Sequence, residues 1–159
     1  SAFIEAIDEH QDKLVSSHSS DDADEIVSDV LLNAVERAND AVFTSAATSN
    51  ELTGMGTTLV CALVTPKRIY SVNVGDSRMY MANRDAITQV TRDHSYVQYL
   101  VDIGKMTPRK AKKSNQRNII TRAVGTESTV EADLYTVNRA VGSKSSFILL
   151  CSDGLTNLV

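Results

Sequence analysis

The chain has 159 residues, of which 42% are hydrophobic and 23% are charged, a composition typical of one soluble globular domain with a buried core. Its net charge of −4 argues against a nucleic-acid-binding protein that depends on bulk positive charge. No apolar run approaches the roughly 18 residues that a membrane-spanning helix needs. The start, Ser1 to Glu5, also lacks the basic and apolar regions of a signal peptide.

The first third of the chain has the hydrophobic spacing of helices. Apolar residues recur near helical spacing at Phe3, Ile4, Ile7, Leu14 and Val15. The polar stretch 16–22 interrupts this pattern, and we expect Ser20 or Asp21 to cap a second helix. Apolar residues between Ile26 and Val42 form one face of that second helix, which should end before Gly54.

The rest of the chain consists mostly of short runs typical of strands. These runs lie at 57–64, 69–74, 79–81, 86–90, 130–137 and 147–151. Helical spacing returns in 95–103, and Thr107 with Pro108 fits the cap and first position of another short helix. Helices followed by short strands and tight turns predict one α+β domain over 1–159, with antiparallel sheets.

The two cysteines, Cys61 and Cys151, both lie inside apolar, strand-like runs. We expect buried free thiols in a protein of the reducing cytoplasm, with a disulfide between neighbouring strands as the alternative. Neither thiol has the closely spaced Cys or His partners of a zinc site.

Two glycine-containing segments precede predicted strands. Gly54–Thr58 fits an ordinary turn, and it lacks the lysine and following helix of a phosphate-binding loop. The segment 74–78, Val-Gly-Asp-Ser-Arg, places Asp76 at a strand end. Asp76 fits either a hairpin turn or a carboxylate that a rigid scaffold directs at a hard cation.

A third segment, 147–155, is predicted as a buried strand that ends at Asp153. A carboxylate at the end of a buried strand is costly unless it is paired or bound to a metal ion. Asp-Gly turns are also common, so this segment alone leaves both interpretations open.

Taken together, five segments resemble the metal-dependent serine/threonine protein phosphatases of the PPM (PP2C-type) family, in its bacterial branch. In chain order they are Gly56-Thr57-Thr58, Gly75-Asp76-Ser77-Arg78, Asp93-His94-Ser95, Arg117-Asn118-Ile119-Ile120-Thr121-Arg122-Ala123 and Cys151-Ser152-Asp153-Gly154-Leu155. The resemblance implies a PP2C-like α-β-β-α sandwich, in which antiparallel sheets pack face to face and helices flank them.

The resemblance also implies a hydrolase that uses Mn²⁺ or Mg²⁺. In such an enzyme a metal-activated water attacks the phosphorus of phosphoserine or phosphothreonine, so no side chain serves as the nucleophile. Asp153 matches a ligand of a core metal ion. Asp76 matches an aspartate associated with a third, weaker metal site.

Other matched positions have supporting roles in the family. The resemblance implies that His94 is a hydrogen-bonded structural histidine and Arg78 a structural ion-pair partner. The segment from about 95 to 116 matches the family's flap beside the active site, although its basic face could simply be solvated. The candidate substrate contacts in this segment are Ser95, Lys105, Lys110 and Lys112.

The chain departs from the family pattern at both ends. We find no Asp-Gly-x-Gly-Gly motif before the first helix, no earlier phosphate-gripping arginine or carboxylate, and no downstream Asp-Asn motif. Asp76 and Asp153 are therefore the only family metal carboxylates in the sequence. We expect an internal fragment, incomplete at both ends, that is inactive by itself and whose exposed strand edges favour dimerisation or strand exchange.

The expected partners are phosphoprotein substrates, with a serine/threonine kinase as a candidate source of the phosphorylation, and neither nucleic acid nor a membrane. The alternative is a non-catalytic pseudophosphatase or phosphoprotein-binding module. The retained Asp76 and Asp153 favour the enzyme, because a pseudoenzyme has no need of them.

Overall fold

Three helices precede all of the strands: α1 (Ala2–Asp8), α2 (Gln11–Ser17) and α3 (Ala23–Thr48). The computed structural model describes residues 1–17, 22–139 and 147–156. The predicted caps Ser20 and Asp21 lie outside the described residues, and Asp22 takes the N-cap position of α3.

The single helical pattern of the first 15 residues corresponds to two helices. The break lies between α1 and α2, where the His10 N–H donates to the Ile7 carbonyl at 3.0 Å. This tighter i→i−3 bond ends α1 one turn before the apolar pattern ends.

The predicted second helix is confirmed as α3, a helix of 26 residues. Its buried face recurs at helical spacing and consists of Val27, Val30, Leu31, Ala34, Val35 and Ala38. A 3₁₀ turn, η1 (Asn50–Leu52), follows it and leads into the first strand.

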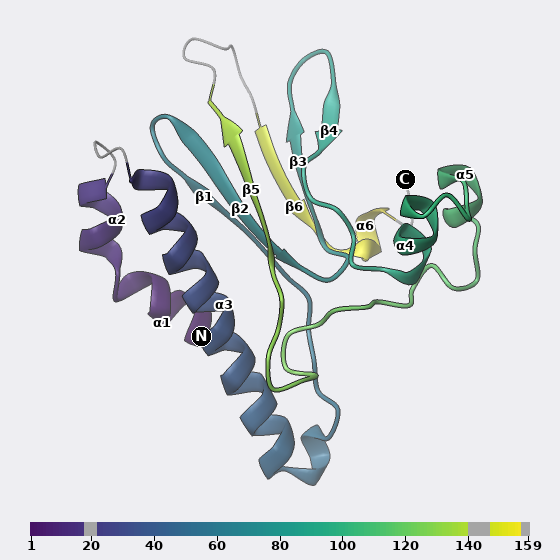
Figure 1. Ribbon diagram of the computed structural model, residues 1–159, viewed down its shortest axis with the longest axis horizontal. Coiled ribbons are helices and arrows are strands. Elements are labelled where there is room, and N and C mark those ends of the chain that lie inside the picture. Colours follow the sequence, from purple (N-terminus) through teal and green to yellow (C-terminus); the bar gives the residue numbers. More distant parts are fainter. Residues whose placement is uncertain (18–21, 140–146, 157–159) are drawn as a thin grey trace.

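Among the described residues, six strands form two antiparallel sheets of three strands each (Figure 1). The first sheet has the order β1-β2-β5, with β1 at Leu59–Val64, β2 at Arg68–Val74 and β5 at Asp133–Asn138. The second has the order β4-β3-β6, with β4 at Ile87–Gln89, β3 at Arg78–Ala82 and β6 at Phe147–Cys151. This arrangement confirms the predicted α+β class with antiparallel sheets.

Three short helices lie at the ends of the second sheet: α4 (Tyr96–Asp102), α5 (Pro108–Ala111) and α6 (Asp153–Thr156). The predicted cap of α5 is confirmed, because Thr107 accepts a hydrogen bond from the Lys110 N–H and Pro108 opens the helix. Ser95 caps α4 in the same manner.

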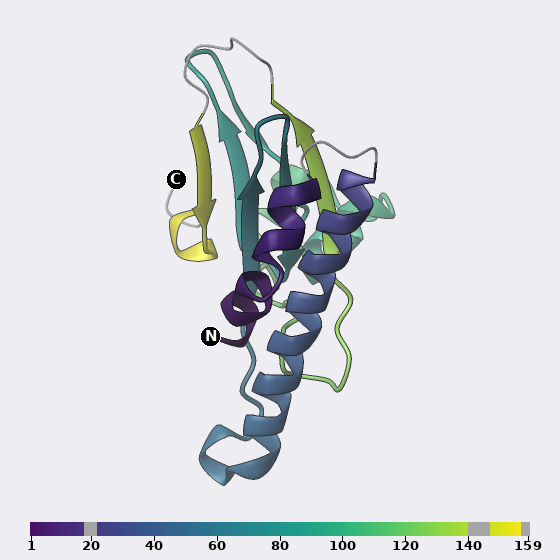
Figure 2. The same cartoon turned by 90° about the vertical axis from the view of Figure 1, so that its left-hand side faces the viewer.

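The core lies between α3 and the first sheet. Figures 1 and 2 show the three N-terminal helices on one side of this sheet and β6 on the other. Leu31 of α3 and Val72 and Val74 of β2 are completely buried in it. Each such side chain contributes about 1.5–3 kcal/mol through the burial of apolar surface, so this layer supplies most of the stability.

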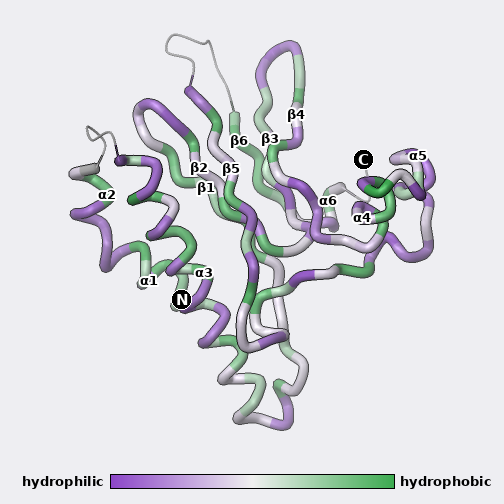
Figure 3. The backbone as a smooth tube through the Cα atoms, viewed as in Figure 1, coloured by the Kyte–Doolittle hydropathy of each residue, from purple (hydrophilic) through white to green (hydrophobic). Residues whose placement is uncertain are grey.

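The prediction of a buried strand at 147–151 is wrong with respect to burial. Phe147, Leu149 and Leu150 of β6 are all exposed, Phe147 at 64%. The reason is that β6 is an edge strand that pairs on one side only, with β3. Figure 3 shows this strand in hydrophobic colours, and Figure 2 shows it at the margin of the described structure.

The strand predicted at 130–137 begins later, at Asp133. Its partner β2 ends at Val74, opposite the start of β5, and Gly75 then turns away. Residues 130–132 therefore have no strand to pair with, although Val130 and Ala132 still pack against the core.

Both cysteines, Cys61 in β1 and Cys151 in β6, are free thiols, as predicted, but the prediction that they are buried is wrong, because each is partly exposed. Of the helices among the described residues, none is both long and apolar enough to cross a membrane.

Candidate functional site

The segment 75–77 connects the first sheet to the second and carries Asp76. The hairpin interpretation of this segment is wrong, because β2 and β3 belong to different sheets. Gly75 has φ +102°, a backbone conformation that is strained for any residue with a side chain. A Cβ atom at this position would also clash with the Thr58 side chain. The Thr58 and Ser77 hydroxyls are 2.7 Å apart, so Gly54–Thr58 supports this crossover.

His94 and Asn73 hold the backbone just before Asp76. The Gly75 carbonyl accepts from the His94 N–H at 2.9 Å, and the Gly75 N–H donates to His94 Nδ1 at 3.1 Å. Asn73 is fully buried, and its Nδ2 donates to the carbonyls of Gly75 and Arg92, both at 3.2 Å. These bonds fix the direction in which the next residue, Asp76, leaves the sheet.

The ring of His94 connects this crossover to β5. Because Nδ1 accepts from Gly75, the ring proton lies on Nε2, 3.2 Å from Asp133 Oδ2. Arg122 donates to the other oxygen of Asp133 at 2.8 Å. His94 is therefore a hydrogen-bonded structural residue, as the sequence predicted.

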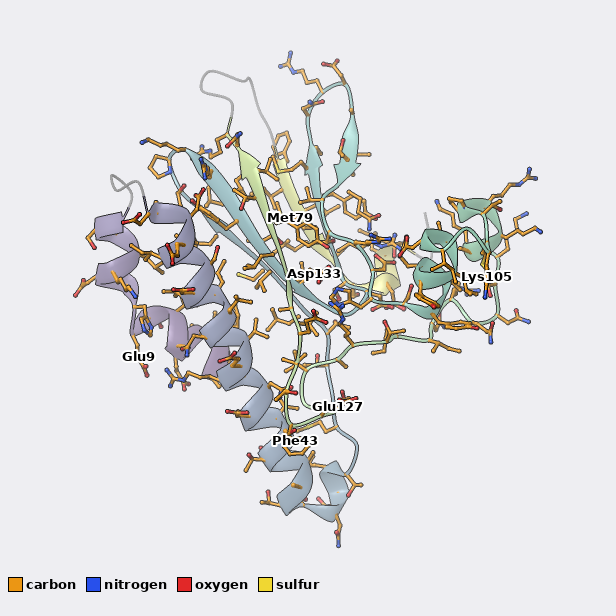
Figure 4. The ribbon with its side chains drawn as sticks, viewed as in Figure 1. Glu9, Phe43, Met79, Lys105, Glu127 and Asp133 are labelled. Carbon is orange, nitrogen blue, oxygen red and sulfur yellow. The ribbon has the colours of Figure 1, made fainter. Side chains whose placement is uncertain are left out.

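The partners of Asp133 favour its charged form more strongly than burial disfavours that form. Burial alone would raise the pKa of Asp133, but hydrogen bonds from His94 and Arg122 hold this pKa below its ordinary value. Figure 4 shows Asp133 near the centre of the structure, close to the end of the first sheet.

Arg78, the first residue of β3, is fully engaged by Asp93. Its guanidinium donates to both oxygens of that carboxylate, at 2.7 and 2.6 Å, and also to the Tyr80 hydroxyl at 3.1 Å. The hydrogen bonds that Arg78 donates to Asp93 raise the pKa of Arg78. Its predicted role as an ion-pair partner is confirmed, and its charge is offset before any ligand arrives.

Strand register brings Asp76 and Asp153 together. Arg78 of β3 pairs with Cys151 of β6 in an antiparallel ladder. Asp76 lies two residues before Arg78, and Asp153, the first residue of α6, lies two residues after Cys151, so both aspartates come from the same end of the β3–β6 pair and line the same cavity. Burial, and secondly the charge of Asp153, raise the pKa of Asp76.

The other motif segments gather at the same place. Ser95 and Ile120 form an isolated β-bridge, and the Thr121 N–H donates to the His94 carbonyl at 2.8 Å. Thr57 pairs with Val124 in a second bridge. All five segments singled out from the sequence therefore meet around the crossover between the two sheets.

A cavity of about 570 Å³ opens beside the two aspartates. The sheet side of this cavity is lined by Asp76, Arg78, Gln89, Asp93 and Asp153. The opposite side, from α4, α5 and the following turn, is lined by Val97, Val101, Pro108, Lys112 and Arg117, among others. The cavity thus has carboxylates on one wall and apolar and basic groups on the other.

The candidate flap residues differ in their placement. Ser95 lines the cavity but is buried and occupied as the cap of α4, where it accepts from the Gln98 N–H. Lys112 lines the cavity and is exposed. Lys105 and Lys110 are exposed on the same segment, outside the cavity lining.

Two neighbouring carboxylates fit a divalent cation, because a cation offsets the repulsion that raises the pKa of Asp76. Among residues 1–17, 22–139 and 147–156, no group of three or more Asp, Glu, His or Cys side chains is arranged to hold a metal ion. The aspartate pair therefore fits part of the oxygen ligand set that Mn²⁺ or Mg²⁺ takes.

Sequence reasoning did not single out Asn73, Thr58 or Asp133 as supports of the site. Asn73 could have been noticed, because a polar residue inside the apolar run 69–74 requires a buried partner. Asp133 carries no comparable signal, since its partners are 39 and 11 residues away along the chain, at His94 and Arg122.

Comparisons with known proteins show the family to which the chain belongs. Residues 4–98 match the sequence profile of the family described as protein phosphatase 2C. The chain is 39% identical over 129 residues to the serine/threonine phosphatase stp of Listeria innocua, a match that covers 81% of this chain and 50% of that protein. The chain spans about half the length of the curated relatives it matches first.

Solved structures give the same result. The crystal structure of the serine/threonine phosphatase Stp1 from Staphylococcus aureus superposes with a TM-score of 0.77 at 42% identity, over 83% of this chain and 51% of that one. A structure described as the catalytic domain of the serine/threonine protein phosphatase PstP in complex with two manganese ions has a TM-score of 0.69 at 36% identity. That match covers 82% of this chain and 52% of that one.

Proposed function

The chain belongs to the protein phosphatase 2C family, and from this premise we propose that the whole protein removes phosphate from phosphoserine and phosphothreonine in other proteins. The observation that supports the proposal is that Asp76 and Asp153 line one cavity, where burial raises the pKa of Asp76 and Asp153 lies close enough for its charge to raise this pKa further. The names of the matched relatives, all serine/threonine or protein phosphatases, support the same reaction.

We propose Mn²⁺ or Mg²⁺ as the cofactor, with Asp76 and Asp153 among its ligands. When bound, such an ion supplies an activated water and neutralises charge on the phosphoryl group. The manganese ions in the PstP structure support the choice of a hard divalent cation.

The chain's own residues have supporting tasks in this proposal. His94 and Asn73 hold the Gly75 backbone, and the Arg78–Asp93 pair fixes the first residue of β3, so Asp76 is oriented from both sides. Lys112 and Arg117 on the opposite wall would face the anionic phosphate. Because no side chain acts as the nucleophile, Cys61 and Cys151 take no part.

Metal binding by the 159-residue chain is the first test. We expect Mn²⁺ to raise the unfolding temperature of the chain and to release heat in a calorimetric titration. Asp76→Asn and Asp153→Asn should each weaken binding, because each removes a ligand charge. Asp85→Asn, an exposed aspartate in the β3–β4 turn, is the matched control and should bind like the unaltered chain. Equal binding by all three variants would contradict the assignment of the pair.

Turnover is the second test. Hydrolysis of p-nitrophenyl phosphate with Mn²⁺ is measured for this chain and for one extended at both ends to the length of its relatives. We expect activity only from the extended chain, because Asp76 and Asp153 alone cannot hold a pair of metal ions. If the extended chain is also inactive, the result would support the alternative, a phosphoprotein-binding pseudophosphatase. The names of the relatives do not favour this alternative.

We further propose that the 159-residue chain self-associates through β6, whose outer edge carries exposed apolar side chains. Light scattering should then give a mass above that of one chain, and a monomeric mass at high concentration would contradict it. The bacterial relatives and the two free thiols support a bacterial cytoplasmic location.

A further inference from the structure

The segment 105–117 is the most basic part of a chain that is acidic overall. It contains no Asp or Glu, whereas the whole chain has 20 of them against 16 Lys and Arg. Its cations, which we call the basic rim, are Lys105, Arg109, Lys110, Lys112, Lys113 and Arg117. A concentration of positive charge in one short segment creates a local field that the net charge of −4 conceals.

The basic rim is exposed and forms no ion pair with the part of the chain that the structure describes. Elsewhere most arginines do find a carboxylate. Those that pair in this way are Arg37, Arg68, Arg78, Arg92 and Arg122. The two rim arginines, Arg109 and Arg117, therefore differ from most other described arginines, and the six rim cations together form a concentration of charge that is available to a ligand.

The basic rim lies beside the candidate site. Lys112 and Arg117 line the same cavity as Asp76 and Asp153. Figure 1 shows α5 next to α4 and across from α6, and Figure 4 shows Lys105 on the α4–α5 side of the molecule. The rim therefore borders the opening through which a phosphorylated side chain would reach the two aspartates.

The segment is also held in place. Arg92 pairs with Asp102 at the end of α4, which ties this helix to the loop between β4 and α4. Thr107 caps α5, and the Lys105 and Met106 N–H groups both donate to the Leu100 carbonyl, at 2.9 and 3.0 Å. The cations thus sit on an ordered support, which limits the entropy lost when a ligand binds them.

We propose that the basic rim binds acidic residues on either side of the phosphorylated serine or threonine, so that the favoured substrates are phosphopeptides rich in Asp and Glu. This inference rests on the proposed function, since it assigns a substrate class to the same cavity. Unpaired lysines and arginines attract carboxylates, and such rim charges act mainly on selection among ligands and on the association rate.

A nucleic acid fits the rim less well than an acidic peptide does. Segment 105–117 has no Phe, Tyr or Trp on which bases could stack.

The test measures binding of the 159-residue chain to two fluorescent phosphothreonine peptides, without divalent ions so that the peptides cannot chelate them. In one peptide Glu residues flank the phosphothreonine, and in the other Gln replaces each Glu. We expect the Glu peptide to bind about fivefold to tenfold more tightly. The chain with Lys110→Glu and Lys113→Glu should lose this preference, and added salt should reduce it.

Lys13→Glu with Lys67→Glu is the matched control, because both lysines are exposed and lie in α2 and the β1–β2 turn. This double variant should keep the preference. Equal binding of the two peptides, an equal effect of the control variant, or tighter binding of single-stranded DNA of the same charge would overturn the inference. Hydrolysis of p-nitrophenyl phosphate, which has no flanking residues, tests the proposed function separately.

Discussion

The two sheets use their apolar residues in opposite ways. In β2 every residue from Ile69 to Val74 is buried, and the alternate residues Tyr70, Val72 and Val74 pack in the core with α3. In β6 Phe147, Leu149 and Leu150 are exposed, and this strand instead delivers Asp153 to the site. The first sheet therefore stabilises the fold, while the ends of the second sheet carry the charged groups of the candidate active site.

The largest expected difference between the two layers is in the free energy of unfolding lost when a leucine in each is replaced by alanine. Leu31→Ala removes a completely buried side chain of α3 and should lower the free energy of unfolding by about 4 kcal/mol. Leu150→Ala in β6, where the side chain is 43% exposed, should cost about 1 kcal/mol or less. Urea denaturation of both variants measures the difference, and equal losses would contradict the assignment of the core to the first layer.

The next prediction concerns the crossover that joins the two layers. Gly75→Ala forces a side chain into positive φ and against Thr58, so it should destabilise the chain by about 3 kcal/mol. Gly104→Ala is the control, because Gly104 also has positive φ but has nothing within 4 Å of a Cβ atom. It should cost only about 1 kcal/mol. Losses of the same size would mean that the crossover is not tightly packed.

Much of the fold is predictable because its signals are local. The α3 face follows from helical spacing, and the start of α5 follows from the pair Thr107-Pro108, which needs no distant partner. The exposure of β6 is not predictable from its apolar sequence, because exposure depends on what covers a strand and not on its own residues. The late start of β5 has the same kind of cause, since it is set by where β2 ends.

The candidate site also has features that the sequence predicts and features that it does not. Asp76, Asp153, His94 and Arg78 lie in short segments that the resemblance singles out, and the structure brings these segments together. The proximity of Asp76 and Asp153 requires the β3–β6 register, which pairs Arg78 with Cys151 across 73 residues of chain. No local pattern specifies such a pairing.

The smallest predicted effect concerns the hydrogen bonds of Asp133 with His94 and Arg122. It tests whether they contribute more to the free energy of unfolding than the exposed Glu9–Arg37 pair of the helical layer does. Asp133 accepts from His94 and Arg122, and these bonds hold its pKa below the ordinary value of 3.8. Because the folded pKa is lowered, the stabilisation is fully present above this ordinary value and is lost as pH falls through the lowered one. Asp133→Asn should therefore cost about 1 kcal/mol at neutral pH, a modest figure because the carboxylate is 36% exposed to screening solvent.

The difference in free energy of unfolding between the Asp133→Asn chain and the unaltered chain should then become smaller when urea denaturation is repeated at pH values below about 4. Glu9→Gln in α1 is the comparison, because the hydrogen bond from Arg37 also lowers the pKa of Glu9, but this pair is open to solvent. That variant should unfold like the unaltered chain at every pH. A larger loss from Glu9→Gln than from Asp133→Asn would mean that the network around His94 contributes less than an ordinary surface pair.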